Sequence, residues 1–166
     1  MPDATGKRWY LIQCKPRQAS RALEHLERQG YECLLPLYFV ERPQKGKLCR
    51  IEEPLFPGYL FIFLDKVEDN WLPIRSTRGV NQIVSFGGIP APIPEYIIEE
   101  LIALPRPTLP ALIEGDRVKI DIPNFRSLDA IFISKDGNER ALLLLSILNR
   151  ELVISISSNS LKKLDS

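Results

Sequence analysis

The chain has 166 residues, 45% of them hydrophobic, and a formal net charge of +1. This length can bury one ordinary core and a small second one, as expected of a globular protein. The longest apolar run, residues 55–64, is much shorter than the roughly 18 residues of a membrane-spanning helix. Residues 1–8 also lack the apolar region of a secretory signal, so we expect a cytoplasmic protein with no membrane contact.

The distribution of charge and the cysteine content indicate which kinds of partner and site this protein can have. Residues 1–50 contain ten Lys and Arg against five Asp and Glu, whereas residues 51–104 contain three against eight. A basic N-terminal third in a nearly neutral chain indicates a local anionic partner. Cys14, Cys33 and Cys49 are odd in number and lack C-x-x-C spacing. We therefore expect reduced thiols, and neither a disulfide framework nor a zinc site.

The N-terminal segment predicts a strand followed by an amphipathic helix. Residues 8–14 alternate in polarity and are rich in aromatic residues, as strands are. Residues 17–29 repeat apolar positions with helical spacing, and Gly30 follows where helices often end. The opposite sector of this helix carries Arg17, Gln18, Arg21, His25 and Arg28. A charged face of this kind is usually solvated, and anion binding is the alternative.

Two strands are predicted after this helix. Residues 33–40 form the first, in which Pro36 indicates an edge position or a bulge. A basic turn follows at residues 44–47, with Gly46 in it. The apolar run 55–64 predicts the central strand of the domain, beginning at about Tyr59 because the preceding Pro-Gly pair indicates a bend.

The central strand has two faces of large side chains. Alternation places one set on each face, namely Tyr59, Phe61 and Phe63 on the first and Leu60, Ile62 and Leu64 on the second. One face is expected to meet helices of the same domain. The aromatic face is covered either by a second set of helices or, as a partner-binding surface, by a neighbouring domain or another protein.

The remaining part of the first domain predicts shorter elements. A short helix or turn begins at residues 70–74, and a strand runs through residues 83–86 before a Gly-Gly pair ends it. Pro94 suits the first position of a helix over residues 95–104. Three prolines within residues 105–110 exclude regular structure there. The resulting division is an N-terminal domain at 1–104, a Pro-rich linker at 105–112 and a small C-terminal domain at 113–166.

The C-terminal domain carries two conflicting patterns. Apolar runs at residues 130–133 and 140–145 flank Asp136-Gly137, which is a strong β-hairpin signal. The same segment also has helical stripes, with Pro123 suited to a first helical turn. These stripes are Phe125, Leu128 and Phe132 before the Asp-Gly pair, and Leu144, Leu148 and Leu152 after it. The residues alone allow both folds.

The inventory of reactive groups argues against an enzyme. His25 is the only histidine, so a multi-histidine metal site is excluded and any catalytic triad depends on this one residue. No phosphate-binding glycine motif is present. We expect no catalytic residues, no metal and no cofactor.

Several stretches together resemble the NusG family of transcription elongation factors, over nearly the whole chain. They are Arg8-Trp9-Tyr10-Leu11, the run from Glu53 to Phe61, Ser76-Thr77-Arg78-Gly79-Val80 and Gly115-Asp116-Arg117-Val118. Further stretches are similar to the operon-specific antiterminators of this family. They are Cys14-Lys15, residues 21–29 and residues 136–145.

The resemblance implies an α+β N-terminal domain, with a mixed sheet and flanking helices, that binds the clamp helices of the RNA polymerase β′ subunit and suppresses pausing and termination. The positions that match the polymerase-binding residues are Leu11, Phe56, Pro57, Tyr59 and Phe61. Residues 70–73 depart from the polar loop by which these antiterminators reach the polymerase β subunit, so no contact is carried over there.

The resemblance also implies recognition of a small hairpin in the non-template DNA strand of a paused complex. The matching residues are Lys15, Gln18, Arg21, His25, Thr77 and Arg78, and most lie on the basic helix sector. Cations of this kind can neutralise phosphates, and Arg78 can form two hydrogen bonds with a guanine edge. Pro16 replaces a basic residue of the family, which removes one charge from the DNA-facing rim.

For the C-terminal domain the resemblance implies a switch. In the free protein an α-helical hairpin covers Tyr59 and Phe61; on release it refolds as a five-stranded KOW-type β-barrel. The barrel recruits the ribosome through a small-subunit protein and couples transcription to translation. The residues expected to hold the domains together are an ion pair of Glu53 with Arg140, and the apolar Phe132, Leu143, Leu144 and Leu148. Pro123 and Ser127 stand where the barrel motif usually has glycines.

Two other functions compete with this interpretation. A general NusG-like elongation factor would bind DNA weakly and without sequence preference, with an affinity that falls as the salt concentration rises. A KOW-type ribosome-associated protein would recover ribosomal particles and no polymerase in a pull-down. In each case we expect a monomer.

Overall fold

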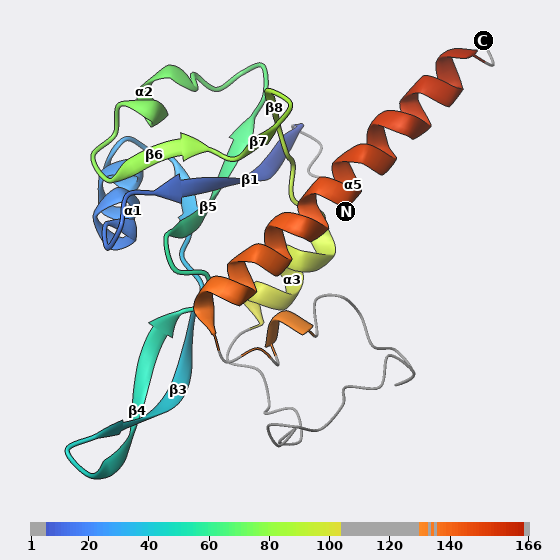
Figure 1. The fold of residues 1–166 in the computed structure, drawn as a ribbon. Coiled ribbons are helices and arrows are strands. Elements are labelled where there is room, and N and C mark those ends of the chain that lie inside the picture. Colours follow the sequence, from blue (N-terminus) through green and yellow to red (C-terminus); the bar gives the residue numbers. More distant parts are fainter. Residues whose placement is uncertain (1–5, 104–129, 133, 135, 165–166) are drawn as a thin grey trace, which may run out of the picture.

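A computed structural model describes residues 6–103, 130–132, 134 and 136–164. Its centre is a four-stranded antiparallel sheet in the order β2-β5-β1-β6 (Figure 1). The strands are β1 (Lys7–Cys14), β2 (Glu32–Leu34), β5 (Tyr59–Asp65) and β6 (Val80–Ile83). β5 begins at Tyr59, as predicted. It also lies inside the sheet, between β2 and β1, which confirms the predicted central position of this strand.

One face of the sheet is covered by helices from the N-terminal domain. Leu60, Ile62 and Leu64 of β5 belong to a buried cluster that includes the apolar stripe of α1 (Ala19–Arg28). Ile74 from α2 (Leu72–Arg75) joins the same cluster. The predicted helix over 17–29 is thus confirmed with a start two residues later, and its apolar stripe is buried as its spacing requires.

The opposite, aromatic face is covered by two helices from different parts of the chain. The first is α3 (Glu95–Ile102), which follows Pro94. The second is α5 (Gly137–Leu164), which crosses over the sheet beside α3 (Figure 1). Their buried side chains share one continuous cluster with Leu11 of β1 and Phe61 of β5. The sheet therefore lies between two helical layers.

The strand predicted over residues 33–40 is divided in two. Pro36 separates β2 from β3 (Leu37–Gln44), which pairs with β4 (Lys47–Pro54) in a sheet of its own. Because proline cannot donate a hydrogen bond to a ladder, the chain leaves the first sheet there. The resulting hairpin projects from the body (Figure 1). Its predicted basic turn is confirmed, since Lys45 and Gly46 have φ values of 50° and 78°.

The C-terminal segment is helical at all of its described residues except Ser134 and Asp136. Residues 130–132 form a helical turn, and α5 begins at Gly137, where the hairpin pattern placed a β-turn. The linker 105–112 and the positions of Pro123, Phe125, Ser127 and Leu128 lie outside the described residues. The division into domains and the β-barrel form stay predictions. Among the described residues, no helix is both long enough and apolar enough to cross a membrane.

The three cysteines are free thiols, as expected. Burial raises the pKa of Cys14 and of Cys33 to about 12, so both stay protonated at neutral pH and are weak nucleophiles. The small hairpin of β7 (Ser85–Phe86) and β8 (Ile89–Pro90) turns at the predicted Gly-Gly pair.

Candidate nucleic-acid and protein interface

The five residues that resemble a polymerase-binding surface lie together on the aromatic face of the sheet. Leu11, Phe56 and Phe61 are fully buried, and Tyr59 is half-buried against the same cluster. Pro57 is exposed on one side and packs against the start of α5 on the other, where a Cβ added to Gly137 would lie 2.5 Å from its Cγ. The surface is therefore assembled but covered.

The cover is the first half of α5 together with the helical turn at 130–132. Leu144 and Leu148 are fully buried in the shared cluster, and Phe132 and Leu143 pack against it. Ile131, Ile147 and Leu152 are buried there as well. All four apolar residues predicted at the domain contact thus lie in it. Because these side chains bury the aromatic face, another protein cannot contact the same face while they are in place.

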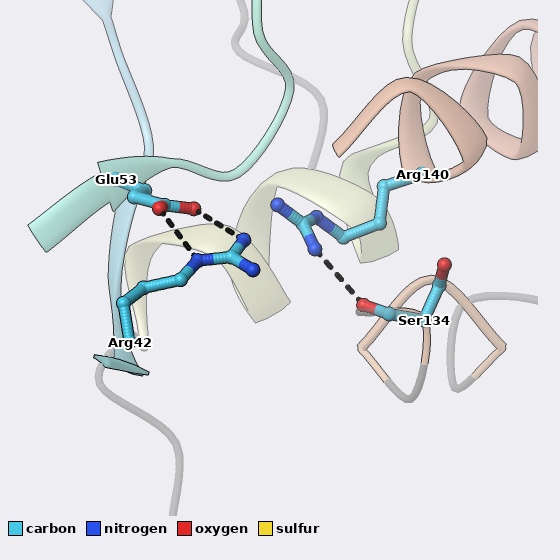
Figure 2. Close-up of polar contacts among 4 residues, drawn as sticks. All are labelled: Arg42, Glu53, Ser134 and Arg140. Atoms are coloured by element: carbon cyan, nitrogen blue, oxygen red, sulfur yellow. Dashed lines mark hydrogen bonds and ion pairs between the residues drawn. The ribbon is translucent and has the colours of Figure 1, made fainter. Parts of the chain in front are cut away.

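A buried cation lies inside this contact. Arg140 of α5 is only 1% exposed, and its Nε donates to the Leu55 carbonyl oxygen at 2.7 Å. One terminal nitrogen donates to the Ser134 carbonyl oxygen at 2.9 Å (Figure 2). The guanidinium lies 4.5 Å from the centre of the Tyr38 ring. Burial lowers the pKa of Arg140, but a guanidinium stays charged at neutral pH, and the two carbonyls and the ring offset its desolvation.

The predicted ion pair of Glu53 with Arg140 is wrong. Glu53 pairs with Arg42 of β3, whose Nε and Nη2 donate to its two carboxylate oxygens at 3.0 and 3.2 Å (Figure 2). The β3–β4 register explains this pairing, because it places Glu53 opposite Tyr38, and Arg42 lies four residues after Tyr38 on the same face of the ribbon. The Arg42 hydrogen bonds are the main cause of the lowered pKa of Glu53, and the charge of Arg140 adds a smaller effect.

The residues predicted to bind DNA come from two segments that pack together. The backbone N–H of Lys15 donates to the Gly79 carbonyl oxygen at 2.8 Å, which joins the start of α1 to the turn before β6. Of the six predicted residues, Lys15, Arg21 and Arg78 are exposed, and Gln18 and His25 are half-buried. This arrangement makes one basic rim from segments about 60 positions apart in the sequence.

Thr77 differs from the expectation. Its side chain is buried, with 7% exposure, and its hydroxyl donates to the Pro73 carbonyl oxygen at 2.8 Å. The hydroxyl oxygen of Thr77 in turn accepts a hydrogen bond from Nε2 of Gln29 at 2.9 Å. Thr77 therefore positions the turn that carries Arg78 and does not present its hydroxyl to solvent.

Three features of these surfaces were not predicted from the sequence. Gln29 links α1 to the turn at Thr77, and Tyr38 supports Arg140. A surface cluster of amides also forms beside the basic rim, where Gln13 accepts hydrogen bonds from Asn81 and Gln82 at 3.0 and 2.9 Å. The β1–β6 pairing, which opposes Gln13 to Gln82, is the signal that would reveal this cluster.

Gly79 is required for the close approach of these two segments. Its φ is +88°, and a Cβ there would lie 2.8 Å from the Gln18 carbonyl oxygen and 3.0 Å from the Ala22 nitrogen. We expect Gly79→Ala to lower the free energy of unfolding by about 1–3 kcal/mol more than Gly30→Ala does, because only the first creates an overlap. Gly30 has a similar φ of +94° with no atom within 4 Å of the added Cβ. Urea denaturation of both variants measures the difference, and equal losses would show that the segments separate easily.

Comparison with known proteins decides the family. A family model described as "Transcription termination factor nusG" matches residues 7–102, more than half of the chain. The chain belongs to the NusG family. Both the aromatic face of β5 and the basic rim lie within the part that matches the NusG model.

The individual NusG proteins that match this chain have sequences distant from it. The "Transcription termination/antitermination protein NusG" of Chlamydia pneumoniae is 23% identical over 145 residues, which cover 78% of this chain and 75% of that protein. The protein of the same description from Streptococcus pyogenes serotype M3 is 25% identical over an alignment of 178 positions, covering 94% and 96%. The match to the Deinococcus radiodurans NusG is 30% identical but covers only 50% and 48%.

A solved structure is also similar to this chain. It is described as "Domain interaction in Thermotoga maritima NusG" and aligns with a TM-score of 0.43 and 22% identity. The alignment covers 60% of this chain and 58% of the Thermotoga chain.

Proposed function

We propose that the chain is an operon-specific transcription elongation factor and antiterminator of the RfaH type within the NusG family. It binds the β′ clamp helices of RNA polymerase through Tyr59, Phe61 and their neighbours, and it suppresses pausing and termination. Membership of a family of transcription termination and antitermination factors supports this role. The family consists of transcription factors and not of enzymes, which agrees with the expected lack of catalytic residues.

The observation that carries the operon-specific assignment is the cover on the aromatic face. Leu144, Leu148 and Arg140 of α5 occupy the surface that a polymerase would need. A general elongation factor gains nothing from such a cover, since it must bind every elongation complex. A factor that waits for one signal does gain from it, because the closed form binds polymerase poorly until the signal arrives.

The signal in this proposal is a small hairpin of the non-template strand, exposed in a paused complex. It is read by the basic rim, where Lys15 and Arg21 neutralise phosphates while Arg78, Gln18 and His25 contact bases. Thr77 acts by holding the turn, as its burial indicates. Such a role places the protein beside transcribed DNA in the cytoplasm, as a monomer without a cofactor.

Release of α5 is the last step of the proposed mechanism. The freed C-terminal domain refolds as a five-stranded KOW-type β-barrel and recruits the ribosome through a small-subunit protein. The support is the Asp136-Gly137 hairpin signal between two apolar runs, which the helical form leaves unused. Two folds that differ by only a few kcal/mol can exchange when one contact is lost.

Transcript mapping with and without the protein tests the proposal and identifies the element. At the pause site found in this way, we expect His25→Ala and Arg78→Ala each to weaken recruitment by about 1–3 kcal/mol, as loss of a base contact does. Polymerase affinity away from the element should be nearly unchanged. Lys66→Ala is the matched control, since Lys66 is an exposed cation outside the rim.

Two outcomes would favour the competing functions. Equal effects of the protein on all transcripts, with no preferred pause site, indicate a general NusG-like factor. Recovery of ribosomal particles without polymerase in a pull-down indicates a KOW-type ribosome-associated protein.

A further inference from the structure

Two arginines and one carboxylate lie where the base of the β3–β4 hairpin meets the cover (Figure 2). Glu53 accepts hydrogen bonds from Arg42 through both of its carboxylate oxygens, at 3.0 and 3.2 Å. The β3–β4 register places Glu53 opposite Tyr38, whose ring lies 4.5 Å from the guanidinium of Arg140. Residues that oppose each other in this way have their Cβ atoms about 5 Å apart. The Glu53 side chain is therefore within reach of Arg140, but Arg42 holds it.

The guanidinium of Arg140 has unused hydrogen-bond donors. Its Nε and Nη1 donate to two backbone carbonyl oxygens, while Nη2 makes no hydrogen bond to any residue that the structure describes. A guanidinium carries more N–H donors than these two bonds use. Because Arg140 is buried, water does not satisfy the others, and a carboxylate is the acceptor that such a cation binds most strongly. Arg140 would therefore bind Glu53 if Arg42 did not.

The charges around Arg140 indicate the direction of the effect. Burial is the largest cause of the lowered pKa of Arg140, while Glu53 attracts the cation and Arg42 repels it weakly. Arg42 is also attracted by Asp136, just before α5, which would favour closure. This attraction is the smallest effect on the pKa of Arg42, and the Asp136 side chain is exposed. The hold of Arg42 on Glu53 therefore dominates, and it disfavours the closed position of the cover.

We infer that Arg42 regulates the cover, weakening the closed form by keeping Glu53 away from Arg140. The inference rests on the proposed function, since it concerns access to the polymerase-binding face. The Arg42 and Glu53 side chains are 46% and 29% exposed, so their ion pair contributes little to stability. A pair of Glu53 with Arg140 would contribute more, because Arg140 is already desolvated and charges attract more strongly away from water. Arg42 thus keeps the cover removable.

Hydrogen exchange of the α5 amides measures closure of the full chain without polymerase. We expect Arg42→Ala to slow this exchange about tenfold, as one added hydrogen-bonded charge pair does, while exchange in β1 and β5 stays the same. Binding to RNA polymerase without a DNA element should weaken by the same factor. In a Glu53→Ser background, Arg42→Ala should slow the exchange by less than about twofold, because no carboxylate is then freed.

Arg50→Ala is the matched control. Arg50 is an exposed arginine of the same hairpin, but it lies over Phe39 on the opposite face of the ribbon, so its loss should leave α5 exchange unchanged. Unchanged or faster exchange in Arg42→Ala would overturn the inference, and faster exchange would show that the attraction to Asp136 dominates. Equal slowing in the Glu53→Ser background would also overturn it. Slower exchange with unchanged polymerase affinity would uphold the effect on the cover and overturn the proposed polymerase-binding face.

Discussion

Replacement of Arg140 by alanine should open the protein. The change removes two hydrogen bonds from a buried cation to the carbonyl oxygens of Leu55 and Ser134, and the contact with Tyr38. Hydrogen bonds to charged groups contribute roughly 1.5–3 kcal/mol each, so the docking of α5 should weaken by about 3–5 kcal/mol. Binding to RNA polymerase without any DNA element should then tighten by about two orders of magnitude.

Polymerase affinity and far-ultraviolet circular dichroism check this result together. If the released segment forms the β-barrel, the spectrum of the full chain should lose helix and gain β signal. Glu53→Ser is the informative control, because Glu53 pairs with Arg42 inside the hairpin and both side chains are partly exposed. An exposed pair contributes little, so this variant should stay closed. Equal opening by both variants would show that attraction to the charge of Glu53 holds Arg140 in place, and not its hydrogen bonds to the two carbonyl oxygens.

The second large effect is expected from Leu148→Ala. Leu148 is fully buried in the cluster that joins α5 to the sheet. A Leu→Ala substitution at such a site lowers the stabilising free energy of packing by about 2–5 kcal/mol. The loss should appear as faster hydrogen exchange in α5 while the amides of β1 and β5 stay protected, because the strands keep their cover from α1. Polymerase binding without an element should rise in parallel.

Leu142 provides a control on the same helix. It is 67% exposed, so Leu142→Ala should change the protection of α5 by less than about 0.5 kcal/mol. Simultaneous loss of protection in α5 and in the sheet of Leu148→Ala would contradict the model of a removable cover. The helix would then be an inseparable part of the N-terminal core.

Periodicity is the reason that much of the N-terminal domain could be predicted. The alternation of β5 assigned its two faces correctly, and the i, i+3, i+4 stripe of α1 identified the helix that covers one of them. These signals are local, because one buried face imposes a period on each element. The need for a second cover on the aromatic face also followed, since Tyr59 and Phe61 had no partner within the nearby sequence.

The parts that could not be predicted depend on register and on tertiary contacts. The partner of Glu53 is decided by the β3–β4 pairing, which no local pattern contains. Thr77 looked available for DNA, but its burial depends on how Gln29 of one segment meets the turn of another. Around Asp136-Gly137 the sequence contains both a helical and a hairpin pattern, and packing on the aromatic face favours the helix.

The position of α5 has a consequence for how the protein responds to its own abundance. The helix belongs to the same chain as the face that it covers, so if polymerase binds that face as proposed, the competition of α5 with polymerase is intramolecular and does not change on dilution. If closure is favoured by about 3 kcal/mol, fewer than about 1% of molecules are open at any concentration, and the apparent affinity for polymerase falls by about two orders of magnitude. A cell could therefore vary the amount of this protein widely without altering the closed fraction.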